Sequence, residues 1–572
     1  MASFFSLLRP ISRSSPAPTF PLAASRNEEP AIPDPAVFTT TPLAVAASGL
    51  PTVSQCAVHL ELLQALSQLR DRVKKESALI EVFGTVDEEQ ETWWRAFVEI
   101  AVGRFEVWWW GVNDELRRRE WGSGELPGDL LPPLDVVMVW HSYMLNPRFY
   151  NEDALHSGLH HILRTAFPWA QIHAALDNEK FEYKLPEPAT QFFEKLSSQS
   201  SSLIDELLWK DVALKKRLRC PHCGKKDIDV RVCDPEKLGI GWMDKAFTVD
   251  CEGCGAVINK EGLCAAKFES DVEVFLKAGA EGRMRMTNFD SRGHAYPTDV
   301  SSATWEPATF INTFFRDPST PRTLRALTAA LPDTQHLPSL RLCLAAYTTP
   351  SPFSLDLAAA VHRQSDFVSK MAYQLWLRSP GLIGTLPFSA ISTVRDRSRS
   401  CVLIESPSSS DGFLARAITR YERFFALFRA HPGHTLVPTL DVDLVWHSAM
   451  LTPELYRVWC RTTARRFVGH DDSLSEGVLG DAFGFTEEAY TSAYGRAYGR
   501  CSCWFCEAAA NEGLQRDDEG GRRWVWRWRR GEEKAVRGVK VRVEFYREVE
   551  RKRRAGSAGL ARAGLFEALK RC

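Results

Sequence analysis

The sequence predicts a mainly α-helical protein with two homologous helical repeat units and a small inserted β zinc ribbon. Apolar residues recur every three or four positions, a 20-residue segment occurs twice, and four cysteines form two CxxC pairs. The 572 residues suffice for several domains of about 150 residues. With 44% hydrophobic and 25% charged residues, the composition is that of a globular protein and excludes a wholly disordered chain.

Composition and motifs divide the chain into six expected segments. Polar or proline-rich runs mark several of the boundaries, such as SSQSSS at 197–202 and ESPSSSDG at 405–412. The segments are a disordered N-terminal leader (1–50), helical repeat unit 1 (51–196), a zinc-ribbon insertion (197–276), a helical connecting region (277–404), helical repeat unit 2 with a Cys cluster (405–510) and a basic Trp/Arg-rich C-terminal extension (511–572).

The N-terminal leader gives information on the location of the protein in the cell. It contains Arg9 and Arg13 and no acidic residue before Glu28, which is the bias of a mitochondrial presequence. Six prolines in the first 33 residues oppose a continuous amphipathic helix. We therefore expect a cytoplasmic or nuclear protein, with a mitochondrial location as the alternative. Since no run of 18 apolar residues occurs, no transmembrane segment is expected, while peripheral membrane contact stays open.

Two early segments have clear helical periodicity. Between Cys56 and Arg72, leucine and valine recur at spacings of three and four, which predicts an amphipathic helix. Residues 90–112 contain so many Trp and Phe that this second helix is expected to be buried. A short helix is predicted to end at Asn146-Pro147, and residues 320–375 are predicted to be helices separated by Pro-containing turns.

An internal repeat is the most informative feature. Residues 131–150 read LPPLDVVMVWHSYMLNPRFY, and residues 437–456 read VPTLDVDLVWHSAMLTPELY. Twelve of the 20 positions are identical, which is far beyond chance and indicates two homologous units. The upstream triplet Arg104-Phe105-Glu106 is echoed by Arg420-Tyr421-Glu422. A separation of 306 residues is too long for a solenoid.

These paired segments resemble the glycine-rich domain-containing protein-like family. The run Gly469-His470-Asp471-Asp472 and the CSCWFC segment at 501–506 are similar to its fungal branch. The resemblance covers most of residues 55–508. It implies a largely uncharacterised family, some of whose fungal members are named 2-oxoglutarate-dependent sulfonate dioxygenases. Family members often carry Trp-His-x-His, whereas this chain has Tyr143 and Ala449 at the second histidine position.

Four cysteines predict a structural zinc site. Cys220 and Cys223 form one CxxC pair, and Cys251 and Cys254 form the other, each followed by glycine that permits a positive φ. Two such turns facing each other supply four thiolates in the tetrahedral geometry that Zn²⁺ favours. Because all four ligands are cysteines, no position remains for water, and the site is expected to be structural.

A second metal site is a separate expectation. Cys501, Cys503 and Cys506 supply three thiolates within a short segment, and His470 is the weak candidate for the fourth ligand, with Cys460 and Cys572 as alternatives. The competing interpretation is a cysteine-rich turn without metal.

The repeated Trp-His pairs give a third candidate site. His141 and His447 occupy equivalent positions, and Asp443 lies four residues before His447 on the same helical face. The first repeat has Val137 there, so a shared carboxylate–histidine pair is not expected. The alternative to an inter-repeat site is that both histidines are buried and hydrogen-bonded.

The short H-x-[DE] motif of iron(II) dioxygenases occurs twice in the sequence. The match at His59 lies inside a predicted helix, and the helical periodicity of the chain argues against the double-stranded β-helix of these enzymes.

The C-terminal extension is basic and aromatic. Residues 516–572 contain 18 Lys and Arg against 9 Asp and Glu, whereas the whole chain has a net charge of -1. Alternating cations and indoles suit stacking on bases, binding an acidic partner, or docking on the chain's own acidic body. The expected nucleic-acid or partner contacts are Arg523, Trp524, Trp526, Arg527, Trp528 and Arg529.

The leading functional hypothesis is a non-enzymatic, zinc-stabilised scaffold or interaction module that binds protein or RNA. The alternative is a metal-dependent enzyme, an oxygenase or hydrolase, with its site between the repeats. The residues name no catalytic group and leave the enzyme question open. The expected cofactor is structural zinc.

Overall fold

The computed structural model describes most of the chain between residues 49 and 499. The described residues are 49–76, 86–177, 180–203, 215–225, 228–232, 241–279, 282–289, 293, 306–330, 338–374, 413–496 and 498–499. The mainly helical fold is confirmed, because helices dominate these residues and the strands are few and short. Within this part of the chain, none of the helices combines the length and the apolar character needed to cross a bilayer.

The first repeat region is built around two long helices. Helix α3 (Val53–Glu76) and helix α4 (Val86–Arg118) cover the two segments with the clearest helical periodicity. On α4, Trp94, Trp108 and Trp109 are buried. Shorter elements complete the region: β1 (Gly124–Glu125), the 3-10 helix η3 (Gly128–Leu130), α5 (Leu134–Met144), α6 (Pro147–His156), α7 (His160–Leu163), β2 (Thr165–Ala166), α8 (Trp169–Ala175) and α9 (Glu187–Ser197).

Proline determines where the helices carrying the repeated segment begin and end. Helix α5 follows Pro133, ends at Met144, and is succeeded by α6 with Pro147 in its first turn. In the second copy, α18 (Leu440–Met450) ends in the same way before α19 (Pro453–Trp459). The missing N–H of proline is tolerated in a first helical turn but would disrupt a helix interior. The same helix–turn–helix therefore forms twice.

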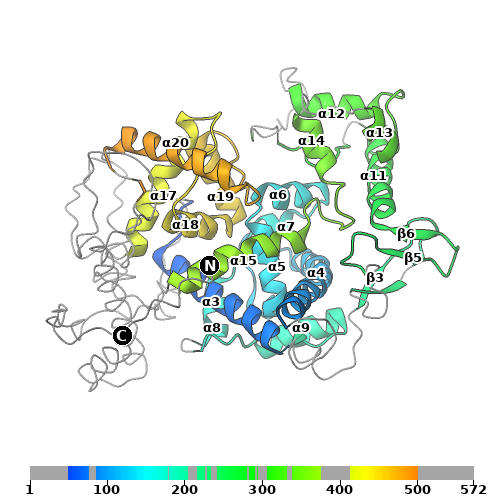
Figure 1. The fold of residues 1–572 in the computed structure, drawn as a ribbon, viewed down its shortest axis with the longest axis horizontal. Helices are drawn as coiled ribbons and strands as arrows, with labels where there is room; N and C mark the ends of the chain where they lie inside the picture. Colours follow the sequence, from blue (N-terminus) through cyan, green and yellow to red (C-terminus); the bar gives the residue numbers. More distant parts are fainter. Residues whose placement is uncertain are drawn as a thin grey trace.

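The remaining helices pack around these two pairs. Helix α15 (Leu357–Gln374) packs on α3, α4 and α5, and α17 (Phe413–Ala430) packs on α18. Figure 1 shows α17, α18 and α20 (Glu476–Tyr494) at the opposite end of the molecule from the strands β3, β5 and β6. A π-helix, η7 (Cys460–Ala464), continues α19 and precedes the loop that carries His470.

Two separate antiparallel hairpins form the small β part. Strand β3 (Lys215–Leu218) pairs with β4 (Ile228–Arg231), and β5 (Thr248–Asp250) pairs with β6 (Val257–Asn259). Helix α11 (Lys260–Lys277) follows β6 directly and leads to α12 (Glu306–Arg316), α13 (Leu324–Ala330) and α14 (Pro338–Ala345). The hairpins lie at the edge of the molecule beside α11 (Figure 1). They have a core of their own, in which Val230, Trp242 and Phe247 are buried.

Equivalent buried ion pairs occur in the two repeat regions. Arg104 Nε donates to Asp135 Oδ2 at 2.7 Å, and Arg420 Nε lies 2.8 Å from Asp441 Oδ2. The two guanidinium groups also lie over aromatic rings, those of Phe193 and Tyr498 respectively. Each pair joins the long helix of its unit to the helix that carries the Trp-His pair.

The repeated Trp and Tyr also make equivalent contacts. Trp140 Nε1 donates to Tyr150 Oη at 3.4 Å, and Trp446 Nε1 donates to Tyr456 Oη at 2.9 Å. These identical positions of the repeat therefore hold matching structural roles, each tying the Trp-His helix to the helix that follows it.

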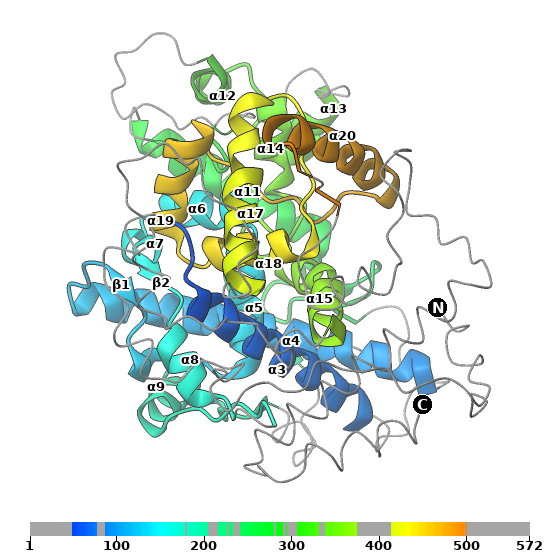
Figure 2. The same ribbon diagram turned by 90° about the vertical axis from the view of Figure 1, so that its left-hand side faces the viewer.

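Helix α3 connects the two regions. It packs on α4, α8 and α15, and also on α17 and α18. In Figure 2, α3 and α4 run along the lower part of the molecule, with α17 and α18 above them. A backbone hydrogen bond from Phe167 N to Leu451 O, at 2.9 Å, provides a further link. One apolar core therefore extends through both regions.

We predict that Asp441→Asn destabilises the protein by about 3 kcal/mol, because Arg420 would keep its charge in a buried position without a carboxylate. Urea unfolding measures this change. Asp114→Asn is the control, since Asp114 pairs with Arg117 on the exposed surface, and little change is expected. Equal unfolding midpoints for the Asp441 variant and the wild type would contradict the proposed role of the buried pair.

Candidate metal centres and the histidine bridge

The four cysteines predicted from the two CxxC pairs lie together. Cys220 Sγ lies 3.8 Å from Cys254 Sγ, and Cys223 Sγ lies 3.7 Å from Cys251 Sγ. All four sulfur atoms lie within 4.8 Å of one another, so the cluster could bind a metal ion. Cys220 and Cys251 are buried, whereas Cys223 and Cys254 are exposed.

Each CxxC pair lies in a tight turn with the same hydrogen-bond pattern. Gly224 N donates to Cys220 O at 3.0 Å, and Gly255 N donates to Cys251 O at 2.7 Å. Gly224 has φ of +75° and Gly255 has φ of +70°, a conformation that a side chain would strain. Backbone N–H groups of Cys223 and His222 donate to the Cys220 sulfur and lower the pKa of its thiol to about 6. A thiolate is the form that binds metal.

The hairpin unit is attached to the helical body through Trp242. Its indole Nε1 donates to Glu99 Oε2 of α4 at 2.9 Å, and the ammonium of Lys216 lies 4.8 Å from the centre of its ring. Lys216 also pairs with Glu99 at 3.7 Å. Trp242 therefore packs in the core around the cysteines and also links the hairpin unit to α4.

A buried histidine on α3 joins the two repeated Trp-His helices. His59 Nε2 lies 2.8 Å from His141 Nε2 on α5, and His59 Nδ1 lies 2.8 Å from Ser448 Oγ on α18. Ser448 Oγ donates its only proton to Leu444 O, so it can only accept from His59. The hydrogen bond between them therefore uses a proton on His59 Nδ1. His59 Nε2 then accepts from His141 Nε2. All three side chains are buried, so this chain of hydrogen bonds crosses from one unit to the other.

The second Trp-His pair has different partners. His447 Nε2 lies 3.1 Å from His470 Nε2 and 3.3 Å from Asp443 Oδ1. His470 Nε2 lies 3.6 Å from the same carboxylate oxygen. The predicted proximity of Asp443 and His447 is thus present, and the first repeat, with Val137 at the corresponding position, has no such carboxylate.

Sequence reasoning missed two of these partners. His59 had only its helical context in the sequence, and nothing local indicates that it meets residues 82 and 389 positions away. His470, a candidate for the fourth ligand of the Cys501, Cys503 and Cys506 cluster, lies beside Asp443 and His447. The three cysteines lie outside the described residues, as do the predicted partner contacts of the C-terminal extension.

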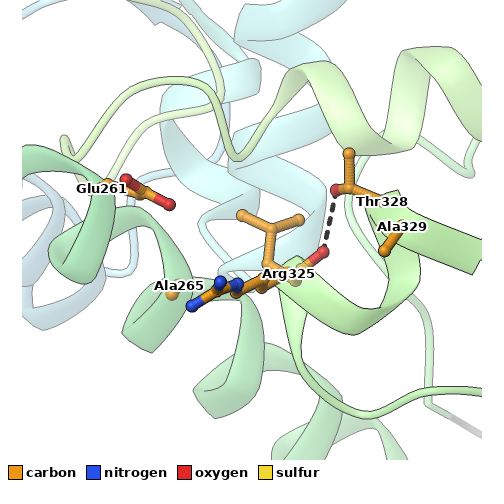
Figure 3. A pocket seen from close by; sticks show the side chains of 6 residues that line it. Glu261, Ala265, Arg325, Thr328 and Ala329 are labelled. Carbon is orange, nitrogen blue, oxygen red and sulfur yellow. Dashed lines mark hydrogen bonds between the residues drawn. The ribbon is translucent and has the colours of Figure 1, made fainter. Parts of the chain in front are cut away.

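A cavity of about 390 Å³ lies apart from these clusters, between α11 and α13. Figure 3 shows Glu261 and Ala265 on one helix facing Arg325, Thr328 and Ala329 on the other. Thr328 Oγ1 donates to Leu324 O, as in a helix interior. None of the predicted site residues lines this cavity.

Burial keeps the bridging histidines neutral. Desolvation, with repulsion from neighbouring imidazoles, lowers the pKa of His59 well below 6.5 and the pKa of His141 to about 3. In the unfolded chain both would take up protons near pH 6.5. Since the unfolded state then binds more protons, the stabilisation is complete above pH 6.5 and is lost as the pH falls towards 3.

We predict that His141→Gln reduces the loss of stability between pH 6.5 and pH 5 by about 2 kcal/mol, because glutamine does not titrate and its amide can still donate to His59. Urea unfolding of both proteins at the two pH values measures this difference. Other titrating groups are the same in both proteins, so their effects cancel when the two changes in unfolding free energy are compared. An unchanged pH dependence in the variant would show that His141 is not a buried neutral group.

Comparisons with known proteins agree with the resemblance carried by the repeated segments. Residues 344–458 match the profile of the family described as glycine-rich domain-containing protein-like. Glycine-rich domain-containing protein 1 of Arabidopsis thaliana is 32% identical over 98 residues, which are 16% of this chain and 12% of that protein. No solved structure matches the chain. The match to this family profile includes Asp443 and His447.

Proposed function

We propose that the chain is a non-enzymatic, zinc-stabilised scaffold or interaction module that binds a protein or RNA partner. The geometry of the four cysteines is the observation that carries this proposal. Tetrahedral thiolates about 2.3 Å from Zn²⁺ are separated by about 3.8 Å. The Sγ–Sγ distances of 3.7 and 3.8 Å fit this requirement.

A closed four-cysteine site supplies folding energy rather than catalysis. Such a site leaves no coordination position for water or substrate. The hairpins around it have few buried residues of their own, and small cores of this kind depend on a metal or disulfides for stability. Zinc would therefore hold the two turns together and present the hairpin surface in a fixed shape.

The exposed surface of the hairpin unit has the charge expected of a module that binds acidic partners. Lys215 and Arg217 of β3 are exposed and alternate with less exposed residues, and Arg219, directly after the strand, is exposed as well. Alternate side chains of a strand point to the same face, so Lys215 and Arg217, which also pairs with Asp229, share one face, and Arg219 extends this basic segment. Phosphate or carboxylate groups are the ligands that such a segment attracts.

We expect Cys223→Ser/Cys254→Ser to lose one zinc ion per chain and to lower the melting temperature of the hairpin unit. These two cysteines are exposed, so their replacement disturbs the packing less than replacing Cys220 or Cys251. Mass spectrometry of the metals in purified, untagged protein gives the zinc content. Cys343→Ser, a buried cysteine outside the cluster, is the control for loss of a thiol and should keep its zinc. A wild type without zinc would contradict the proposal.

We expect Lys215→Glu/Arg217→Glu/Arg219→Glu to weaken binding of a fluorescent single-stranded RNA by tenfold or more, with a shallower dependence on salt. Arg117→Glu/Arg118→Glu, which alters exposed cations on α4, is the control for net charge. Arg523→Glu/Arg527→Glu/Arg529→Glu tests the predicted contacts of the C-terminal extension. Binding that only the latter substitutions weaken would assign the contact to the extension. If the wild type does not bind RNA, the proposed partner is a protein, and cross-linking tests for it.

The alternative function, a metal-dependent enzyme with its site between the repeats, requires a second kind of metal site with an open coordination position. The observation that favours a metal-dependent enzyme is the cluster of Asp443, His447 and His470, which lies within the second repeat region and provides one carboxylate and two imidazoles at ligand distances.

A further inference from the structure

We propose that Asp443, His447 and His470 form a second metal site, which binds a divalent first-row transition-metal ion and leaves coordination positions for water or a small ligand. This site is independent of the four-cysteine cluster and of the proposed scaffold function. It lies between α18, the loop after η7 and α15.

The distances between the three ligand atoms fit a single ion. Asp443 Oδ1, His447 Nε2 and His470 Nε2 are separated by 3.1, 3.3 and 3.6 Å. Ligands about 2.1 Å from a common ion are separated by about 3.0 Å in cis-octahedral geometry and about 3.4 Å in tetrahedral geometry. The observed triangle therefore has the size that a single ion requires.

The chain holds these ligands in place from several sides. Asp443 and His447 are one helical turn apart on α18, which places them on the same face. The loop carrying His470 is tied to α15 through Asp472, whose carboxylate accepts from Arg363 Nε at 2.7 Å and from Gln364 Nε2 at 2.9 Å. Phe367 of α15 packs on the His447 ring at 4.2 Å, and Trp446 packs edge-on against His470.

One ligand atom of the cluster lacks a hydrogen-bond partner, and a cation would relieve this deficit. Asp443 Oδ1 is buried and has no hydrogen-bond partner within the described part of the chain, while the Nε2 atoms of both histidines lie within 3.6 Å of it. The His447 side chain is 1% exposed and that of His470 is 9% exposed. Uncompensated buried polar atoms are costly, and each one calls for an explanation.

One side of the cluster faces solvent. The Asp443 side chain is 19% exposed, so an ion at this position can be reached by water. Three protein ligands do not complete a coordination sphere, which distinguishes this cluster from the four cysteines. Water or a small ligand would occupy the remaining positions.

The donor set determines the class of metal. Two imidazoles with one carboxylate suit Fe²⁺, Zn²⁺ and Co²⁺, whereas Mg²⁺ and Ca²⁺ prefer oxygen ligands alone. The first repeat offers no equivalent site, because Val137 replaces the carboxylate and His141 is engaged by His59. One such ion per chain is therefore expected.

The test adds Co²⁺ or anaerobic Fe²⁺ to the full chain carrying one equivalent of Zn²⁺, the amount that the four cysteines take up. The wild type should bind one further ion, and bound Co²⁺ should show d–d absorption without the sulfur charge-transfer band of a thiolate site. Asp443→Asn and His470→Gln should each weaken this binding by more than about 100-fold. Mg²⁺ should not compete. The Cys223→Ser/Cys254→Ser protein should keep the nitrogen–oxygen site.

His434→Gln is the matched control, because His434 is an exposed histidine near the same unit that stacks on Phe485, and it should leave Co²⁺ binding unchanged. Circular dichroism and retention of the cysteine-bound zinc show whether each variant is folded. A zinc-filled wild type that takes up neither Co²⁺ nor Fe²⁺ would overturn the proposal whatever the variants do. Equal binding by folded wild type and both ligand variants would overturn it as well.

Discussion

The contact of His59 with both repeated Trp-His helices is the constraint on which the rest of the helical body depends. Three hydrogen-bonding groups, on α3, α5 and α18, meet where no water can replace a missing partner. A buried imidazole left unpaired would cost about 1–3 kcal/mol, so the three helices are held in one relative position. The proximity of the two units, and with it the location of His447 beside α15, follows from that position.

The two units share a framework but use their histidines differently. In both, an arginine on the long helix pairs with an aspartate on the Trp-His helix, and a tryptophan is tied to a tyrosine of the next helix. Within that framework, valine or aspartate one turn before the histidine sets its chemistry. With Val137 the imidazole of His141 pairs with another imidazole, whereas with Asp443 the imidazole of His447 joins a carboxylate. The two Trp-His segments thus provide a structural contact in one case and a candidate metal ligand in the other.

Much of the fold could be predicted because its signals are local. Helical periodicity, prolines at helix starts and CxxC spacing each act within a few residues, and they located α3, α4, α5 and the four cysteines. The partners of His59 could not be predicted, because they are brought to it only by packing of helices distant in sequence. For the same reason the contact of His470 with His447 on α18 could not be predicted. A single sequence does not show which residues distant in the chain come into contact.

Coupling of the two units by His59 can be measured with a double-mutant cycle on unfolding free energies. His59→Ala and Ser448→Ala each remove one side of the hydrogen bond between two side chains that are 389 residues apart in sequence and 2.8 Å apart in the structure. The contact predicts a coupling energy of about 1 kcal/mol or more between the two substitutions. Effects that add to within about 0.3 kcal/mol would contradict it, because independent sites give additive changes.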